Sequence, residues 1–394
     1  MIAREITEDI LSISAIDWDR RLFDELVPLP EGTSYNSYLV KGSEKNALID
    51  TAYPPMTAEY IAALKATGIR KLDYIIADHG EQDHTGSIPA VLEIFPDAMV
   101  VTNAKCKDMI TEALPVAEDK FIVVEDGQTI SLGDKTLQFF LTPWVHWPDT
   151  MCTYIAEDKI LFSCDFFGSH VAGSDLFATN EALVEDAAKR YYAEIMMPFR
   201  SFIRQHLEKL APLQIDFIAP SHGPVYSRPA FILDLYKEWA SDVAKKEVVI
   251  AYVSMYDNTT KMVDYLTDRL MEKGLSVKRF NMVGVDTGQF TKALVDASTV
   301  VFATPTVLTG PHPSVVTGIY LLHVLKAKTK FVAVVNSYGW SGNLADRIKD
   351  MLPKLKAQLR YLDPVLVKGL PKENDYKALD RLADEIYLAN NPAS

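Results

Sequence analysis

The chain has 394 residues, of which 48% are hydrophobic and 24% charged, and its formal net charge is −13. This length exceeds one ordinary core and predicts two domains. The acidic charge, without a Lys/Arg block, excludes a typical nucleic-acid-binding protein, and no apolar run approaches the roughly 18 residues of a membrane span.

The N-terminus and the cysteines indicate the compartment. MIAREITEDILSI lacks the basic start and apolar middle of a secretory signal, so we expect a cytoplasmic protein. The three cysteines, Cys106, Cys152 and Cys164, form neither a CxxC pair nor a disulfide framework. Cysteine-ligated metal is therefore not expected.

The first half, to about residue 165, alternates short β-rich runs with turn signals. Helical periodicity appears at 56–67, at 87–95 and, after residue 181, in a long amphipathic segment that ends near residue 210. Dense strands interrupted by helices predict an α/β sandwich of two sheets with helices outside. The expected strands are 34–42, 46–52, 72–78, 98–104, 120–126, 137–144 and 159–165.

The second half alternates strand and helix strictly, after a boundary near residues 241 to 247. Repeated βα units with apolar strands predict a doubly wound parallel sheet. We therefore expect domains at 1–245 and 246–394. The expected strands are 248–254, 277–282, 299–305 and 331–337, and the helices are 258–272, 288–296, 314–326 and 342–352.

Residues 77 to 86, ADHGEQDHTG, follow an apolar strand and are rich in metal-binding side chains. Because side chains alternate along an extended chain, we expect His79, Glu81 and Asp83 on one side and His84 pointing elsewhere, which suits a site with two ions rather than one. A single HxE pair is usually only a polar stretch of surface, but further potential metal ligands stand at or just after the ends of later predicted strands. The seven donors that together predict a metal centre are His79, Glu81, Asp83, His84, His146, Asp165 and His222.

The pattern HGEQDH, followed by His, Asp and His, resembles the metallo-β-lactamase-fold family over residues 1–245. Glu81 stands where the zinc hydrolases of that family have histidine. Zinc favours nitrogen and sulfur ligands, whereas carboxylates added to imidazoles suit iron. HxExDH is the version found in flavodiiron proteins, the oxygen- and nitric-oxide-reducing enzymes of anaerobes.

Three loops of the second half leave the carboxyl ends of predicted strands, where doubly wound sheets bind ligands. YVSMYDNTTKM also opens a helix, whose N-terminus favours phosphate. This half resembles flavodoxin, which implies FMN, with Tyr338 and Trp340 beside the flavin ring. The residues expected at FMN are Ser254, Met255, Tyr256, Asp257, Asn258, Thr259, Pro305, Thr306, Val307, Leu308, Ser337, Tyr338, Gly339, Trp340, Ser341 and Gly342.

One loop departs from the family pattern, because flavodiiron proteins usually have asparagine where Leu308 and Thr309 stand. Contacts from the backbone to the flavin survive such a change. We therefore still expect FMN, with an altered flavin potential.

With the lactamase-like half first and the flavodoxin-like half second, the whole chain resembles a flavodiiron protein. The resemblance implies one iron on His79, Glu81 and His146, a second on Asp83, His84 and His222, and Asp165 between them. In some members the histidine matching His84 turns away and water replaces it. His170 and Tyr192 match positions that line the substrate pocket of the family, although a loop histidine and a core tyrosine explain them equally well.

The same resemblance implies that O2 is reduced to water, or NO to N2O, at the di-iron centre, which FMN re-reduces, for detoxification in an anaerobe. No CxxC module follows the last predicted helix, so an external donor, rubredoxin or reduced F420, is expected. Head-to-tail homodimers or homotetramers are implied as well. Two alternatives remain: a zinc-dependent hydrolase with a flavodoxin-like appendage, and a flavin electron carrier or redox sensor with an inactive first domain.

Overall fold

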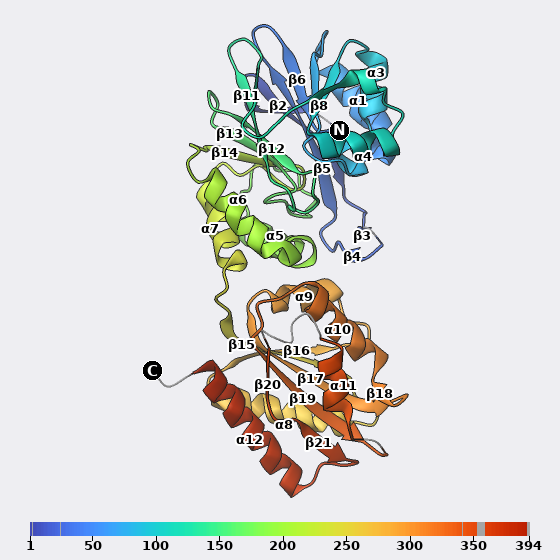
Figure 1. The fold of residues 1–394 in the computed structure, drawn as a ribbon, viewed down its shortest axis with the longest axis vertical. Helices are drawn as coiled ribbons and strands as arrows, with labels where there is room; N and C mark the ends of the chain where they lie inside the picture. The colour runs from blue at the N-terminus through green and yellow to red at the C-terminus, as the bar shows by residue number, and fades with distance from the viewer. Residues whose placement is uncertain (2, 24, 341, 353–358, 392–394) are drawn as a thin grey trace. The chain divides into compact units, whose positions relative to one another are not determined.

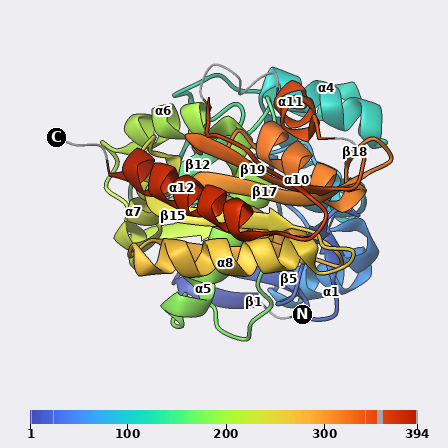
Figure 2. The ribbon, with the colours of Figure 1, turned by 90° about the horizontal axis from the view of Figure 1, so that it is seen from below.

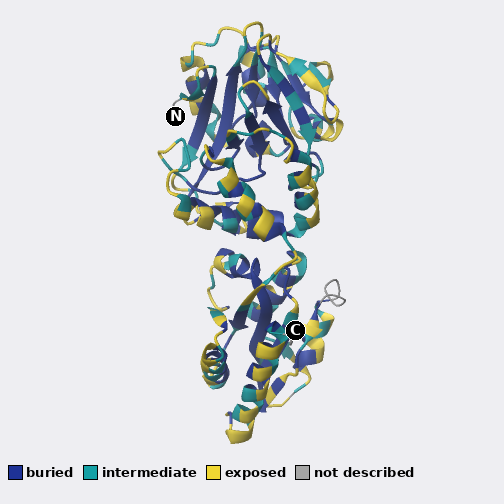
Figure 3. Ribbon diagram, turned by 90° about the vertical axis from the view of Figure 1, so that its left-hand side faces the viewer, coloured by how far each residue is buried: buried dark blue, intermediate teal, exposed yellow. Residues whose placement is uncertain are grey.

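The computed structural model describes residues 1, 3–23, 25–340, 342–352 and 359–391, which form two compact units. The first unit contains Met1–Tyr191 and Phe199–Ala240, and the second contains Tyr192–Pro198 and the chain from Ser241 onward. The strands of both units are mostly buried, whereas the helices expose one face (Figure 3). The main division lies beside the expected boundary.

The first unit is built from two stacked sheets (Figure 1). Apolar side chains of both sheets, such as Val40 and Phe162, form the core between them. The seven-stranded sheet is β1 (Ala3–Thr7), β2 (Ile10–Asp17), β5 (Thr33–Lys41), β6 (Asn46–Ile49), β7 (Tyr74–Ile76), β8 (Met99–Thr102) and β9 (Phe121–Val123); the five-stranded sheet is β10 (Thr129–Ser131), β11 (Thr136–Leu141), β12 (Met151–Ile155), β13 (Ile160–Cys164) and β14 (Phe217–Pro220); β3 (Leu22–Phe23) and β4 (Val27–Pro28) form a hairpin.

Helices cover the outer faces of these sheets, which gives the expected sandwich of helix, two sheets and helix. A second apolar core, with Leu39 and Ile75 from the seven-stranded sheet, lies beneath Tyr60, Val91 and Ile110 of three helices. The helices of this unit are η1 (Pro54–Met56), α1 (Thr57–Ala66), α2 (Gln82–Thr85), α3 (Ile88–Ile94), α4 (Ala104–Ala113), η2 (Glu118–Lys120), α5 (Glu181–Tyr191), α6 (Arg200–Leu210) and α7 (Pro229–Ala240).

Two helical features differ from the sequence-based expectation. The long amphipathic segment is not continuous: between α5 and α6 lie a π-helical stretch, Tyr192–Met196, and a 3-10 turn, Met197–Phe199. Pro198, which lacks an N–H, interrupts the regular ladder there. Helix α4 was not expected, although Asn103 caps it by accepting from the backbone N–H groups of Lys105 and Cys106.

The second unit is a parallel sheet in the order β16-β15-β17-β19-β20, with β21 also paired to β19. Counted along the chain this is the order 2-1-3-4-5 of flavodoxin-like folds. Helices α8 and α12 lie side by side on the sheet (Figure 2), and α10 packs on β15 and β17. The elements are β15 (Lys245–Tyr252), α8 (Asn258–Glu272), β16 (Ser276–Asn281), α9 (Thr287–Leu294), β17 (Ala297–Val307), β18 (Gly310–Pro311), α10 (Pro313–Val324), β19 (Phe331–Tyr338), α11 (Leu344–Asp350), β20 (Arg360–Tyr361), β21 (Val365–Lys368) and α12 (Glu373–Asn390).

Candidate metal centre

All seven predicted donors meet in the first unit, on segments that leave the strands of both sheets. The HGEQDH segment follows β7 and runs into α2, so it comes from the seven-stranded sheet. The remaining three donors come from the other sheet: His146 lies between β11 and β12, Asp165 directly follows β13, and His222 follows β14.

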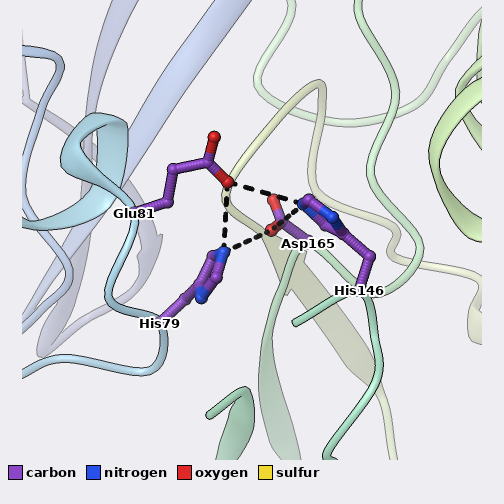
Figure 4. A group of neighbouring side chains, drawn as sticks. All are labelled: His79, Glu81, His146 and Asp165. Atoms are coloured by element: carbon purple, nitrogen blue, oxygen red, sulfur yellow. Dashed lines mark hydrogen bonds and ion pairs between the residues drawn. The ribbon is translucent and has the colours of Figure 1, made fainter. Parts of the chain in front are cut away.

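One group of donors consists of His79, Glu81, His146 and Asp165 (Figure 4). Glu81 Oε2 lies 3.2 Å from His79 Nε2 and 3.5 Å from His146 Nε2. Asp165 Oδ2 lies 3.6 Å from each of the same two nitrogens. Two imidazoles and two carboxylates therefore converge on one position.

The second group consists of Asp83, His84 and His222, and it uses the other oxygen of Asp165. Asp165 Oδ1 lies 3.2 Å from His84 Nε2 and 3.3 Å from His222 Nε2. Asp83 presents Oδ1 at 3.5 Å to His84 and Oδ2 at 3.3 Å to His222. Asp165 thus faces both groups, one oxygen to each, as a carboxylate between two ions would.

The local reason for this arrangement differs from the expected one. The strand stops at Ile76, and Gln82–Thr85 is a helical turn, so strand alternation does not govern these side chains. The expectation that His84 points away from Asp83 was wrong, because both lie in the second group. Adjacent side chains lie about 100° apart around a helical turn, whereas in an extended chain they point to opposite faces, so the turn allows Asp83 and His84 to approach each other.

Three of the four histidines are held at Nδ1 by a protein oxygen, which leaves Nε2 facing the centre. Such partners fix the tautomer and ring orientation of a metal-binding histidine. They are Asp149 Oδ2 at 3.0 Å for His79, Asp50 Oδ2 at 3.3 Å for His84, and the Ser34 carbonyl at 2.8 Å for His222. Sequence reasoning did not find Asp50 or Asp149, although each stands at a strand end or beside a predicted donor.

Several atoms at the middle of the centre are buried without a hydrogen-bond partner among the described residues. They are both carboxylate oxygens of Asp83, Asp165 Oδ2 and His84 Nε2. Buried polar groups are normally satisfied, and buried charges are normally paired or bound to metal. The donor set of imidazoles and carboxylates therefore fits two cations of the iron class.

The electrostatics of the metal-free centre favour the same conclusion. Burial lowers the pKa of His79, but Asp149 and Glu81 outweigh this and raise it to about 10. Burial also lowers the pKa of His222, and Asp165 and Asp83 raise it to about 9. Burial raises the pKa of Asp165, yet the neighbouring histidines hold it well below its usual value. Protons thus occupy the histidines when metal is absent, and metal must displace them.

The two groups differ in their access to solvent. The side chains of Glu81 and His146 are each 16% exposed, whereas those of His84 and His222 are 1% and 2% exposed. Trp147, partly exposed, stands edge-on to His79 with ring centroids 5.0 Å apart. One metal position is therefore open on one side, and the other is enclosed by protein.

One of the two expected pocket residues, His170, lies against the centre. It is buried, with its ring centroid 5.1 Å from that of His222, and its Nδ1 is 2.8 Å from Thr33 Oγ1. A tyrosine that was not expected, Tyr191, also lies beside the centre, and its hydroxyl donates to Asp165 Oδ1 at 2.9 Å. Tyr192, the residue expected from the sequence, is buried and begins the segment that groups with the second unit. Its place in the substrate pocket stays a prediction.

The expected FMN residues lie at the carboxyl ends of three neighbouring parallel strands, β15, β17 and β19. Ser254 Oγ accepts from the backbone N–H of Thr260, and α8 begins at Asn258. Large apolar side chains are exposed along this edge: Met255 (51%), Tyr256 (82%), Leu308 (84%) and Trp340 (67%). A helix N-terminus for phosphate and exposed aromatic side chains for a flat ring suit FMN.

Two qualifications apply to this edge. Ser341 lies outside the described residues, so nothing is assigned to it. Leu308 and Thr309, where the resemblance predicts asparagine, have φ of 48° and 64°. This left-handed region suits asparagine and glycine, so the sequence departure falls where the backbone is least suited to it.

Comparisons with known proteins agree with this two-part architecture. Residues 33–223 match the model of the family described as ODP family beta lactamase. The chain is 34% identical to the nitric oxide reductase of Moorella thermoacetica over 97% of both chains, and 32% identical to the coenzyme F420H2 oxidase of Methanothermobacter marburgensis over 98% of both. Rubredoxin oxygen:oxidoreductase from Desulfovibrio gigas superposes with a TM-score of 0.94 at 30% identity, over 99% of this chain and 98% of that one.

Fold and site together define a protein with a lactamase-like metal unit and a flavodoxin-like unit in one chain. The relatives that match over their full length identify the family: the chain belongs to the flavodiiron proteins, and it is an oxidoreductase. A flavodiiron protein from Giardia intestinalis shares the fold at 26% identity, with a TM-score of 0.89 over 100% of this chain. Within the described residues, no helix has both the length and the apolarity to cross a membrane.

Proposed function

We propose that this flavodiiron protein reduces O2 to water, NO to N2O, or both, at a di-iron centre that FMN re-reduces. The observation that carries the proposal is the position of Asp165, whose two oxygens face two separate donor groups, one with His79, Glu81 and His146 and one with Asp83, His84 and His222. The names of the full-length relatives, which include nitric oxide reductase and rubredoxin-oxygen oxidoreductase, support the reaction class.

When bound, two irons supply electrons to the diatomic substrate, and FMN supplies electrons to the irons; the cofactors carry this redox chemistry. The chain would hold one metal at His79, Glu81, His146 and Asp165 and the other at Asp83, His84, His222 and Asp165, and the two positions differ in exposure. The first position has Glu81 at a partly exposed edge, whereas the second is enclosed. A small neutral substrate can therefore reach the first position from solvent, whereas the second position is shielded from water.

The chain also shapes the surroundings of the substrate. Burial holds the pKa of His170 well below its usual value, and the nearby His222 lowers it further, so this ring is neutral. Tyr191 donates its hydroxyl hydrogen to Asp165, which orients the carboxylate between the two groups. An uncharged wall suits O2 and NO, because neither molecule repays the desolvation of a nearby charge.

For the electron donor and assembly we propose an external donor, rubredoxin or reduced F420, and head-to-tail homodimers or homotetramers in the cytoplasm. A donor protein or F420H2 appears in the names of full-length relatives. If the flavin of one subunit serves the irons of another, dilution to monomers abolishes turnover. Full activity in a demonstrated monomer would refute that assembly.

The decisive experiment measures iron, zinc and flavin per chain in protein purified without oxygen from iron-supplemented cells. About two irons and one FMN are expected. The reduced protein is then mixed with O2 or with NO in a stopped-flow instrument, and flavin reoxidation is followed. Zinc at both positions with no iron, or a reduced flavin that neither gas reoxidises, would overturn the proposal and favour a hydrolase or an electron carrier.

A further inference from the structure

The imidazole of His84 has a second set of neighbours on the side away from the centre. Its Nδ1 lies 3.3 Å from Asp50 Oδ2 and 3.7 Å from Cys164 Sγ. All three side chains are buried, with residues exposed by 2% or less. If Nε2, which faces Asp83 and Asp165, binds a metal, Nδ1 must carry the proton of the neutral ring and donates it to Asp50.

Asp50 is itself fixed by the segments that carry other donors. Its Oδ1 accepts from the backbone N–H of Asp78, next to His79, at 2.9 Å. Its Oδ2 accepts from Ser221 Oγ, next to His222, also at 2.9 Å. One carboxylate therefore connects the segments of three histidines, and it cannot turn away from His84 without losing these bonds.

The backbone of His84 is held from the same side. Its carbonyl accepts from both the N–H and the hydroxyl of Thr51, at 2.6 and 2.7 Å. Asp50 and Cys164 both have left-handed backbones, with φ of 50° and 53°. Such conformations cost non-glycine residues free energy and often mark functional positions. Here Asp50 directly follows β6 and Cys164 ends β13, and both side chains reach the same nitrogen.

We propose that Asp50 and Cys164 are positioning residues that keep His84 turned toward the centre as a permanent ligand of the second metal. The inference rests on the proposed di-iron centre and deepens it. In this chain the Asp50 carboxylate and the Cys164 thiol contact Nδ1 of the ring, and Thr51 binds the backbone carbonyl of His84. Together these contacts keep the ring turned toward the centre.

An alternative reading makes Asp50, His84 Nδ1 and Cys164 a third metal site, since the three groups converge. The hydrogen bonds of Asp50 disfavour it, because both of its oxygens already accept from other groups, Oδ1 from the backbone N–H of Asp78 and Oδ2 from Ser221 Oγ.

The test is cobalt loading of metal-depleted, flavin-containing protein, read by visible absorption, which reports the coordination number, and by cobalt bound per chain. The variants are Asp50→Asn and Cys164→Ala, with His84→Ala as the reference for a lost ligand. Cys152→Ala is the matched control, because Cys152 is also fully buried but lies on β12 against Thr142. Melting curves and flavin content show whether each variant folds.

We expect Asp50→Asn to weaken the second cobalt by about tenfold or more and to reproduce the spectrum of His84→Ala, as losses of such partners typically do. Cys164→Ala should have a smaller effect of the same kind, and Cys152→Ala none. If Asp50→Asn does not fold, Ser221→Ala removes the hydroxyl that fixes Asp50 and should weaken the second cobalt in the same way.

The proposed role of Asp50 and Cys164 would be overturned if the folded Asp50 or Ser221 variant and Cys164→Ala have the spectrum and cobalt affinity of the wild type while His84→Ala differs. A third cobalt that disappears in Cys164→Ala would overturn it in favour of a third site. Failure of the proposed function is distinguishable, because it would appear in the wild-type protein, as zinc in place of iron or as a reduced flavin that neither gas reoxidises, whereas failure of this inference would appear only in the cobalt binding of the variants.

Discussion

The metal centre and the flavin edge solve the binding problem in opposite ways. At the metal centre five of the seven donors are buried, and most are held from behind by a carboxylate, a hydroxyl or a carbonyl, such as Asp149 behind His79. At the flavin edge the side chains of Tyr256, Leu308 and Trp340 are mostly exposed. The metal donors are therefore set in place by the fold, whereas the flavin edge offers a surface that a cofactor must cover.

This difference follows from the ligands. A small cation needs several donors at fixed distances, and that geometry requires supporting residues around each donor. A flavin presents a large flat surface and a phosphate, so backbone N–H groups and a few aromatic side chains can bind it with less support. Substitutions at the metal centre should therefore have large effects that are confined to metal binding and turnover, whereas substitutions at the flavin edge should have small effects.

The largest expected effect comes from Asp165→Asn, which removes the one charge shared by both donor groups. Metal affinity should fall on the order of 100-fold or more at both positions, and turnover with it, because a ligand is lost rather than a supporting partner. Flavin content should not change. Metal analysis and flavin absorbance on the same sample check this, with the exposed Asp97→Asn as control. Loss of only one metal would show that Asp165 does not connect the two positions.

A second substitution, Glu81→His, changes the metal preference at the open position. It restores the HxHxDH pattern and replaces an anionic oxygen donor by a neutral nitrogen donor, which favours zinc over iron. We expect the zinc-to-iron ratio to rise and flavin reoxidation by O2 or NO to slow by about tenfold or more. Glu44→His, at an exposed turn, is the control. An unchanged metal ratio would show that position 81 does not select the metal.

A third prediction concerns pH, and it separates the metal-free centre from the loaded one. The pKa values of about 10 for His79 and about 9 for His222 lie above the ordinary value, so both rings are protonated at pH 7. Metal binding must expel these protons, and apparent metal affinity should rise between pH 6 and pH 8. Calorimetry in buffers of different ionisation enthalpy measures the protons released. No release would contradict the stated charge of the centre.

The same shifts have a consequence for stability. A histidine whose pKa is raised on folding stabilises the protein fully below its unfolded value of about 6.5, and this contribution is lost as pH rises through the folded value. The metal-free first unit should therefore lose stability as pH rises toward 9 and 10. Metal-loaded protein, whose histidines have no such proton to lose, should change less over that range. Parallel melting curves would reveal the difference.

Sequence reasoning predicted the fold class, which is confirmed, and the seven donor residues that the structure brings together, because those residues belong to a short motif and to strand ends. It did not find Asp50, Asp149 or Tyr191, which act by touching donors distant in the chain. Tyr191 and Tyr192 are adjacent, so only helix geometry decides which one faces Asp165. The orientation of His84 was wrong for a similar reason: strand periodicity was applied to a segment that is a helical turn.

The smallest expected effect lies at the flavin edge, at Thr309, a β-branched residue with φ of 64°. A left-handed conformation costs such a residue about 1–2 kcal/mol, and asparagine tolerates it better. Thr309→Asn should therefore raise the unfolding free energy of the second unit by about 1 kcal/mol. Asparagine keeps a side-chain oxygen for Arg347, which donates to Thr309 Oγ1 at 3.4 Å.

Urea unfolding followed by flavin release measures this gain. Thr317→Asn is the matched control, because Thr317 is exposed in helix α10, where threonine and asparagine have similar propensities. The metal content of Thr309→Asn should equal that of the wild type, since the substitution lies in the other unit. The opposite outcome is a lower unfolding free energy for Thr309→Asn than for the wild type, beyond any change in Thr317→Asn. It would mean that Thr309 makes a contact in this loop that stabilises the protein by more than its left-handed backbone costs.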